Sequence, residues 1–187
     1  MQRAIQQPAP RYFGKVIDSP VGPLKLVASE RGLAAILWAN DDPRRVPLGE
    51  IVAGDSHAVL LEAERQLGEY FAGQREQFAL PMDFRGTEFQ RRVWRALLTI
   101  PFGETRSYAQ LAQQIGRPAA VRAVGAANGR NPLSIIAPCH RVLGSNGKLI
   151  GFAGGLEAKA KLLSLERLQT KRSTMRDSSQ NVLRTCS

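Results

Sequence analysis

The stretch SYAQLAQQIGRPAAVRAVGAANGRN, residues 107–131, carries the clearest fold signal in the chain. Ser107 can cap a short helix over residues 107–115, and Gly116 follows where that helix should end. Pro118 suits the first turn of a second helix, which we expect to reach about residue 128. A helix, a short turn containing glycine and a second helix form the helix-turn-helix pattern.

The second of these helices is unusually rich in small side chains. Its small residues are Ala119, Ala120, Ala123, Gly125, Ala126 and Ala127, which surround Arg122. Small side chains let a helix backbone come close to whatever it faces. Tight packing on a neighbouring helix and close approach to a ligand both explain this composition, and the residues alone leave both open.

Upstream, residues 11–40 predict a meander of three β-strands. Apolar runs rich in valine, isoleucine, leucine and aromatic residues are separated by the turn sequences SPVGP and SERG. A polar loop over residues 41–54 follows. These features place a small β-sheet at the N-terminal end of the chain.

Two further helices are predicted between this sheet and the helix-turn-helix. Residues 56–73 have the apolar spacing of an amphipathic helix, with Ser56 as its cap and Gly73 at its end. Residues 87–100 show the same periodicity, and Thr87 stands at the capping position.

Downstream, residues 131–142 predict an extended apolar segment, and a loop with a short strand follows it. A last helix is expected over residues 156–168. Its predicted inward face consists of Leu156, Ala160, Leu163 and, less centrally, Leu162. From Gln169 the chain is rich in serine, threonine, arginine and glutamine, which predicts a disordered basic tail over 169–187.

The fold class is therefore α+β, with a sheet domain over residues 1–80 and a mostly helical domain over 84–168. Charge follows the same division. Residues 1–83 have a net charge of −2, residues 84–168 of +9 and residues 169–187 of +3. A basic half joined to a mildly acidic half indicates a polyanionic partner for one half.

Composition excludes several classes of protein. An apolar content of 43% supports a core and argues against wholesale disorder. No run of about 18 apolar residues occurs, so no membrane span or membrane partner is expected. The first nine residues lack a signal-peptide pattern, and two cysteines make no disulfide framework. We therefore expect a cytoplasmic protein with free thiols, although a bridge between Cys139 and Cys186 remains an alternative.

Cys139 lies in the stretch IIAPCHRVLG, beside His140 and Arg141. A zinc site needs three or four suitably spaced ligands, and Cys139, His140 and the distant His57 do not supply such a set. Burial as a packing residue is a stronger alternative, because free cysteines are among the most buried residue types. The charged residues that follow at once favour a nucleophile instead.

A nucleophilic thiol needs a base to take its proton and a group to hold that base. His140 is the nearest histidine in sequence. In an extended strand its side chain would point away from that of Cys139, so we expect it to act through a bend or a bridging water. Glu166 is our choice for the orienting carboxylate, but the residues alone do not separate it from Glu157.

The chain resembles the O6-alkylguanine-DNA alkyltransferases, or methylated-DNA–protein-cysteine methyltransferases, in four short motifs. These are PCHRV at 138–142, NP at 131–132, RAVG at 122–125 and GG at 154–155. The match runs from about Thr87 to Leu168 and is weaker over 11–80. It is closest to the bacterial constitutive type, which implies a ribonuclease-H-like fold for the N-terminal sheet domain.

By position, this resemblance implies a role for each residue of the candidate active site. Cys139 matches the alkyl acceptor, His140 the water-linked base and Glu166 the carboxylate that orients it. Asn131 matches the asparagine that braces the active-site segment. Tyr108 matches the tyrosine that helps turn the target nucleotide and assists the departing guanine.

The resemblance also implies a DNA-binding surface. Arg122 matches the arginine that fills the gap left by the rotated base, and the helix 118–128 matches one that enters the minor groove. Contacts with DNA are also implied for Gln90, Arg91, Ala123, Ala126, Ala127 and Ser145.

The function implied is single-turnover repair of double-stranded DNA that contains O6-alkylguanine, with O4-alkylthymine as a further candidate substrate. The alkyl group would pass to Cys139 without a cofactor or metal, in a monomeric protein. Two alternatives from other classes remain: a cysteine hydrolase using the same Cys and His, and a helix-turn-helix regulator. Two departures from the family are Phe152, where some members have tyrosine, and a first domain without cysteine, so that structural zinc is not implied.

Overall fold

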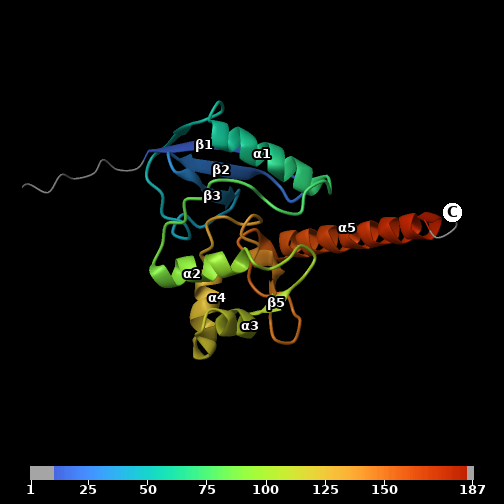
Figure 1. The fold of residues 1–187 in the computed structure, drawn as a ribbon. Helices are drawn as coiled ribbons and strands as arrows, with labels where there is room; N and C mark the ends of the chain where they lie inside the picture. The colour runs from blue at the N-terminus through green and yellow to red at the C-terminus, as the bar shows by residue number, and fades with distance from the viewer. Residues whose placement is uncertain (1–10, 185–187) are drawn as a thin grey trace, which may run out of the picture.

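A computed structural model describes residues 11–184, of which residues beyond 171 are described by their helical backbone only. An N-terminal sheet with one helix lies above a group of shorter helices, and the last helix extends away from the body of the protein (Figure 1). One hydrophobic core runs from the sheet into the helical half. The two halves are therefore packed together.

The predicted meander of three strands is confirmed. Strands β1 (Tyr12–Ile17), β2 (Leu24–Ser29) and β3 (Gly32–Trp38) pair antiparallel in sequence order. A fourth strand, β4 (Ile51–Ala53), pairs parallel with β1, where we predicted only loop. The sheet order is β3-β2-β1-β4, so β3 forms one edge.

Helix α1 (Ala58–Phe71) packs against the sheet. Its predicted cap, Ser56, is wrong, because His57 occupies the capping position and no side chain caps the helix. The predicted end is confirmed: Gly73 follows the last turn with φ of 75°, a conformation that glycine adopts without strain.

Three helices form most of the second half. Helix α2 (Glu88–Leu97) begins at Thr87 with a capping box completed by Gln90, and α3 (Tyr108–Gln114) begins at Ser107 with a similar box. After the turn at Gly116, a 3₁₀ turn, η1 (Pro118–Ala120), leads into α4 (Val121–Gly129). The helix-turn-helix is thus present, with its second helix starting as a 3₁₀ turn.

The segment from Asn131 to Leu143 joins the two halves. Leu133 forms a parallel bridge with Ile36 at the outer edge of β3, and the Ile36 N–H donates to the Pro132 carbonyl at 2.8 Å. We predicted that this segment is extended throughout. That is wrong at its end, where a 3₁₀ turn, η2 (Cys139–Arg141), interrupts it. Short strands β5 (Arg106–Ser107) and β6 (Val142–Leu143) then pair in parallel, so the predicted strand lies earlier than expected.

The final helix, α5 (Gly155–Arg184), is longer than predicted. We expected a helix to residue 168 and a disordered tail, but the helix continues to Arg184; residues 185–187 lie outside the described part. The physical reason is that no proline or glycine occurs between residues 169 and 184 to end the helix.

Candidate alkyl-acceptor site

A cavity of about 520 Å³ opens in the second half of the protein, with Arg45 of the first half at one side, and Cys139 lies in its wall. Side chains from the N-terminal loop, from α3, α4 and η2, and from the segment before α5 surround it. Its lining includes Arg45, Tyr108, Arg122, Gly125, Asn128, Asn131, Ser134, Cys139 and residues 150–153.

The Cys139 side chain begins the 3₁₀ turn η2 and is only 4% exposed. Burial raises the pKa of the Cys139 thiol, because a low-dielectric environment disfavours the thiolate. Hydrogen bonding from Asn131 and the positive charges of Arg45 and Lys159 act in the opposite direction. The thiol is therefore protonated at rest but lies among groups that favour its anion.

Asn131 holds the segment that presents Cys139. Its Nδ2 donates to the Ala137 carbonyl at 2.7 Å, and its Oδ1 accepts from the Leu133 N–H at 3.1 Å. Between these two points Ile135 has φ of 74°, which is strained for a β-branched residue. The asparagine side chain thus joins both ends of this strained loop by hydrogen bonds.

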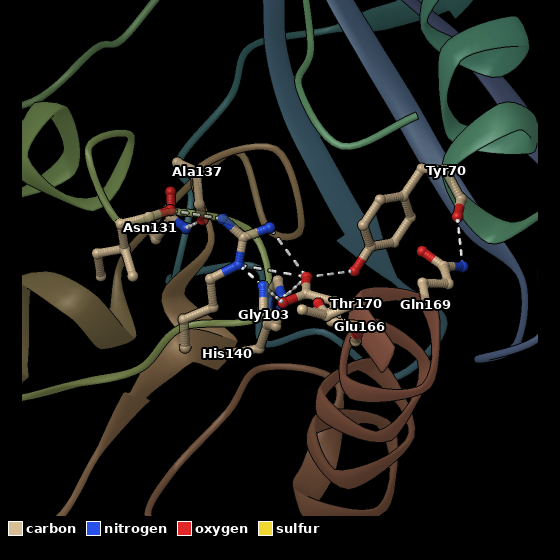
Figure 2. Close-up of polar contacts among 10 residues, drawn as sticks. Tyr70, Gly103, Asn131, Ala137, His140, Glu166, Gln169 and Thr170 are labelled. Carbon is tan, nitrogen blue, oxygen red and sulfur yellow. Dashed lines mark hydrogen bonds and ion pairs between the residues drawn. The ribbon is translucent and has the colours of Figure 1, made fainter. Parts of the chain in front are cut away.

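His140 and Glu166 are in direct contact, as Figure 2 shows. The His140 Nε2 and the Glu166 Oε1 are 2.8 Å apart, and both side chains are fully buried. An ionised carboxylate only accepts, so Nε2 carries the proton and Nδ1 is left with a lone pair. Among the described residues, the buried Nδ1 has no hydrogen-bond partner.

The structure separates the two candidate carboxylates that the sequence left open. Glu157 is largely exposed and pairs with Lys161 at 2.8 Å on the surface of α5. Glu166 lies nine residues further along, on the inward face of the same helix. Burial lowers the pKa of His140, even though Glu166 favours its charged form, so the imidazole is neutral and able to accept a proton.

Glu166 is the centre of a buried network that draws on both halves of the protein (Figure 2). It accepts from the Tyr70 hydroxyl at 2.8 Å, from Arg141 Nε and Nη2, both at 2.9 Å, and from the Gly103 N–H at 3.2 Å. Burial alone would favour the neutral acid, but hydrogen bonds from His140 and Arg141 hold the pKa of Glu166 at about 2. The carboxylate is therefore permanently charged and fixed in place.

Sequence reasoning missed Arg141, Tyr70, Arg45 and Lys159. Arg141 also donates to the Ile100 carbonyl at 2.6 Å, and its guanidinium lies 5.5 Å from the centre of the Phe102 ring. Its place directly after the Cys-His pair was an available signal, whereas Tyr70 belongs to a distant helix and gave none.

Lys159 explains why the inward face of α5 was predicted wrongly. Its ammonium is fully buried and donates to the carbonyls of Val142 and Ile150 at 2.7 and 2.8 Å. The inward stripe is Ala158, Lys159, Leu162 and Glu166, while Leu156 and Ala160 are exposed and Leu163 is partly buried. Apolar periodicity fails here because two charged side chains with partners occupy core positions.

Arg45 belongs to the loop between β3 and β4, yet it reaches the second half. It forms an ion pair with Asp41, donates to the Ile36 carbonyl at 3.1 Å and donates to the Asn131 carbonyl. The guanidinium thus connects the edge strand of the sheet to the loop that carries Cys139.

Tyr108 and α4 form the mouth of the cavity. The Tyr108 hydroxyl lies 3.5 Å from Asn128 Nδ2 and from the Ile150 carbonyl oxygen, at the limit of hydrogen bonding. Arg122 also lines the cavity, and its side chain is exposed.

The small residues of α4 face two ways. Ala123 and Ala126 are exposed to solvent, whereas Ala127 is only 3% exposed. Its carbonyl accepts from Trp94 Nε1 at 2.8 Å, so α4 turns Ala127 towards α2. The expectation that Ala127 contacts DNA is therefore wrong. Tight helix packing explains the small side chain of Ala127, and close approach to a ligand remains the explanation for Ala123 and Ala126 on the exposed face.

The remaining candidates lie outside the cavity. Gln90 is partly buried and its amide oxygen accepts from the Thr87 N–H at 2.9 Å, so it acts at least as a cap of α2. Arg91 is exposed on the first turn of that helix. Ser145 is exposed in the turn between Gly144 and Lys148, beside the cavity-lining segment but not part of it.

Across residues 11–171 no three His, Cys, Asp or Glu side chains come together as metal ligands would. No helix within the described range is both long and apolar enough to cross a bilayer. Cys139 forms no disulfide with a described residue, and Cys186 lies outside them.

Two family models together match most of the stretch from residue 13 to residue 168. Residues 13–84 match the ribonuclease-like domain of 6-O-methylguanine DNA methyltransferase, and residues 88–168 match its DNA binding domain. The α+β fold with a ribonuclease-like first domain is thereby confirmed.

Sequence relatives and solved structures point to the same family as the two family models. The chain is 50% identical over 155 residues to a methylated-DNA–protein-cysteine methyltransferase of Mycolicibacterium paratuberculosis, covering 82% of this chain and 91% of the relative. It is 48% identical over 152 residues to one of Methanosarcina barkeri, covering 81% and 94%. A crystal structure of Mycobacterium tuberculosis OGT in complex with DNA superposes with a TM-score of 0.76 and 46% identity, covering 85% of this chain and 94% of that one. The chain belongs to the 6-O-methylguanine DNA methyltransferase family.

Proposed function

We propose that this protein repairs DNA by transferring the alkyl group of O6-alkylguanine to its own Cys139, once per molecule. The observation that carries the proposal is a buried thiol in the wall of an open cavity, followed directly by a histidine that is fixed by a buried carboxylate. The related Mycobacterium tuberculosis protein has been crystallised with DNA, which agrees with a DNA substrate.

The chemistry begins with removal of the Cys139 proton. His140 has the free Nδ1 lone pair needed to accept it, and a bridging water can span the two side chains because they follow each other in a tight turn. Because its pKa is about 2, Glu166 stays ionised at neutral pH, and its negative charge stabilises the imidazolium that forms. The positive charges of Arg45 and Lys159 favour the thiolate.

The thiolate then attacks the alkyl carbon in a single displacement. The new S–C bond forms as the C–O6 bond breaks, and the electron pair of that bond stays with guanine. The departing base gains a proton, so that the net proton transfer is from sulfur to guanine, and the Tyr108 hydroxyl is placed at the cavity to assist by donating a hydrogen bond. The thioether product has no leaving path, so Cys139 is consumed.

DNA binding is assigned to α4 and the basic second half. The exposed Ala123 and Ala126 let the backbone of α4 enter the minor groove, and Arg122 fills the space left by the rotated nucleotide. Gln90 and Arg91 at the start of α2, and Ser145 beside the cavity, contact the sugar-phosphate backbone. A net charge of +9 over residues 84–168 makes this binding dependent on salt and largely insensitive to sequence.

The proposal needs no cofactor or metal, because the DNA donates the alkyl group and the protein accepts it. We further propose that the protein acts as a monomer in the cytoplasm. O4-alkylthymine remains a second candidate lesion for the same cavity.

Mass spectrometry of the protein after incubation with a duplex containing O6-methylguanine tests the function. We expect one methyl group per molecule, located on the Cys139 peptide, and none in a Cys139→Ala variant that still binds the duplex. Methyl loss from DNA in large molar excess over protein would indicate a turnover hydrolase. Folded protein that binds DNA but leaves Cys139 unmodified would indicate a regulator.

A further inference from the structure

Trp38, at the end of β3, reaches from the sheet domain to residues 150–154, here called the cavity loop, of which 150–153 line the cavity. Its side chain is only 7% exposed. Gly154 lies so close to the indole that an added Cβ would be 2.5 Å from the nearest ring carbon. The Phe152 ring packs edge-on against the same indole, with ring centres 5.2 Å apart.

Phe152 connects this contact to the reacting groups. It lines the cavity together with Cys139, and its ring lies 6.3 Å from that of His140 at an angle of 78°. The indole of Trp38 therefore stands directly behind one wall of the cavity. That wall consists of a loop rather than a helix or strand, so its position depends on what supports it.

We propose that Trp38 is a positioning residue that sets the width of the alkyl cavity and thereby the size of the alkyl group that Cys139 accepts. This inference rests on the proposed function and adds to it a specificity determinant in the sheet domain. Trp38 acts through Phe152 and has no contact with the reacting atoms of its own.

The same end of β3 also fixes the opposite wall. The Trp38 N–H donates to Asp41 Oδ2 at 3.2 Å, and Asp41 pairs with Arg45, which donates to the Asn131 carbonyl. One short piece of the sheet domain thus holds both the cavity loop and the loop that carries Cys139. A rigid aromatic side chain with two rotatable bonds suits such a spacer better than a flexible one.

Changes on the two sides of the contact should act with opposite sign. Trp38→Leu leaves room for Phe152 to move back and widens the cavity. Gly154→Ala pushes the cavity loop away from the indole, towards Cys139, and narrows it; the φ of Gly154 lies outside the left-handed region, so alanine fits its backbone. In the double variant the new methyl occupies space that the indole has vacated, and the two effects should partly cancel.

The measurement is the rate constant for transfer to Cys139 from one duplex sequence carrying either O6-methylguanine or O6-benzylguanine, so that DNA binding cancels in the ratio. We expect the benzyl-to-methyl ratio to rise about tenfold in Trp38→Leu and to fall about tenfold in Gly154→Ala, a range typical of hydrophobic pockets. The double variant should lie between them. Leu60→Ala serves as a control, since it truncates the core of the same domain on α1 and should lower stability without altering the ratio.

Two results would overturn the inference: a ratio that stays within about twofold of wild type in both single variants, or a shift in the same direction in both. If Trp38→Leu does not fold, the sign of the Gly154→Ala change decides alone. Failure of the proposed function is a separate result, because wild-type protein would then accept neither group.

Discussion

Replacing Glu166 with glutamine removes the charge on which the buried network is built. The side chain keeps its size, but His140, Arg141 and Tyr70 then face an amide instead of a carboxylate. The Arg141 guanidinium is only 5% exposed and would be left without its counter-ion. Breaking a buried ion pair in this way costs about 3–5 kcal/mol of unfolding free energy.

The loss should depend on pH in a way that identifies Glu166 as its source. The folded protein holds the pKa of Glu166 at about 2, below the ordinary value of 4.5 for the unfolded chain. Its contribution is therefore complete above about pH 4.5 and is lost as pH falls towards 2, because the unfolded chain takes up the proton first. The interval between the two pKa values corresponds to about 3 kcal/mol.

Urea unfolding at several pH values between about 6 and 3 measures this contribution as the difference between wild type and Glu166→Gln. Other carboxylates titrate in both proteins and cancel in the difference. We expect the gap to be largest near neutral pH and to shrink by about 1.4 kcal/mol for each pH unit below 4.5. The variant should also fail to methylate Cys139 at pH 7, where it is still folded.

A gap that stays constant from neutral to acid pH would refute this reasoning, since it would mean that Glu166 has the same pKa in the folded and unfolded chain. Full methyl transfer by the variant would refute the orienting role of the carboxylate.

Three other outcomes follow from the same contacts. Tyr70→Phe should lower the unfolding free energy by about 1.5–3 kcal/mol and slow methyl transfer. Ser29→Ala is the control: it also loses a buried hydrogen bond to a carboxylate, so it should lower stability but leave the transfer rate unchanged. Thermal unfolding and transfer rates measured in parallel test both. Arg122→Ala should reduce repair of O6-methylguanine more than it reduces binding to undamaged duplex. Arg31→Ala removes the same charge from an exposed position in the sheet domain and should affect neither. Equal losses of repair and of binding in Arg122→Ala would contradict a gap-filling role. Cys139 in the free protein should react more slowly with iodoacetamide at pH 7 than free cysteine, with a rate that rises with pH, because burial raises the pKa of its thiol above the ordinary value of 9.

Local signals predicted the elements that depend on neighbours in sequence. Thr87 and Ser107 each precede a helix and each have glutamine three residues later, and both capping boxes are present. Strand β4 was missed because three residues carry little pattern, and its pairing partner is the distant β1. The cap was placed one residue too early, because serine is a preferred capping residue and histidine is not, whereas the helix begins after His57 without a side-chain cap.

In the candidate site, too, local sequence predicts neighbouring residues but not contacts between distant segments. The sequence places Cys139 and His140 together, and a resemblance to known proteins pointed to Glu166. The structure alone shows why Glu166 and not Glu157 is suitable, because only the former meets Arg141 and Tyr70. Buried charges are the hardest residues to predict from a pattern, since their partners come from segments far away in the chain.

The electrostatic state of the resting site suits an acceptor that is used once. Burial raises the pKa of Cys139 and lowers that of His140, so both are neutral in the free protein, while Glu166 remains ionised. A protonated, buried thiol reacts slowly with stray electrophiles and oxidants. This matters more for a protein that cannot regenerate its cysteine than for a turnover enzyme, because each stray reaction removes a molecule permanently. The positive charges of Arg45 and Lys159 nevertheless favour the thiolate, so His140 can form it by accepting the proton through the bridging water when a lesion is bound.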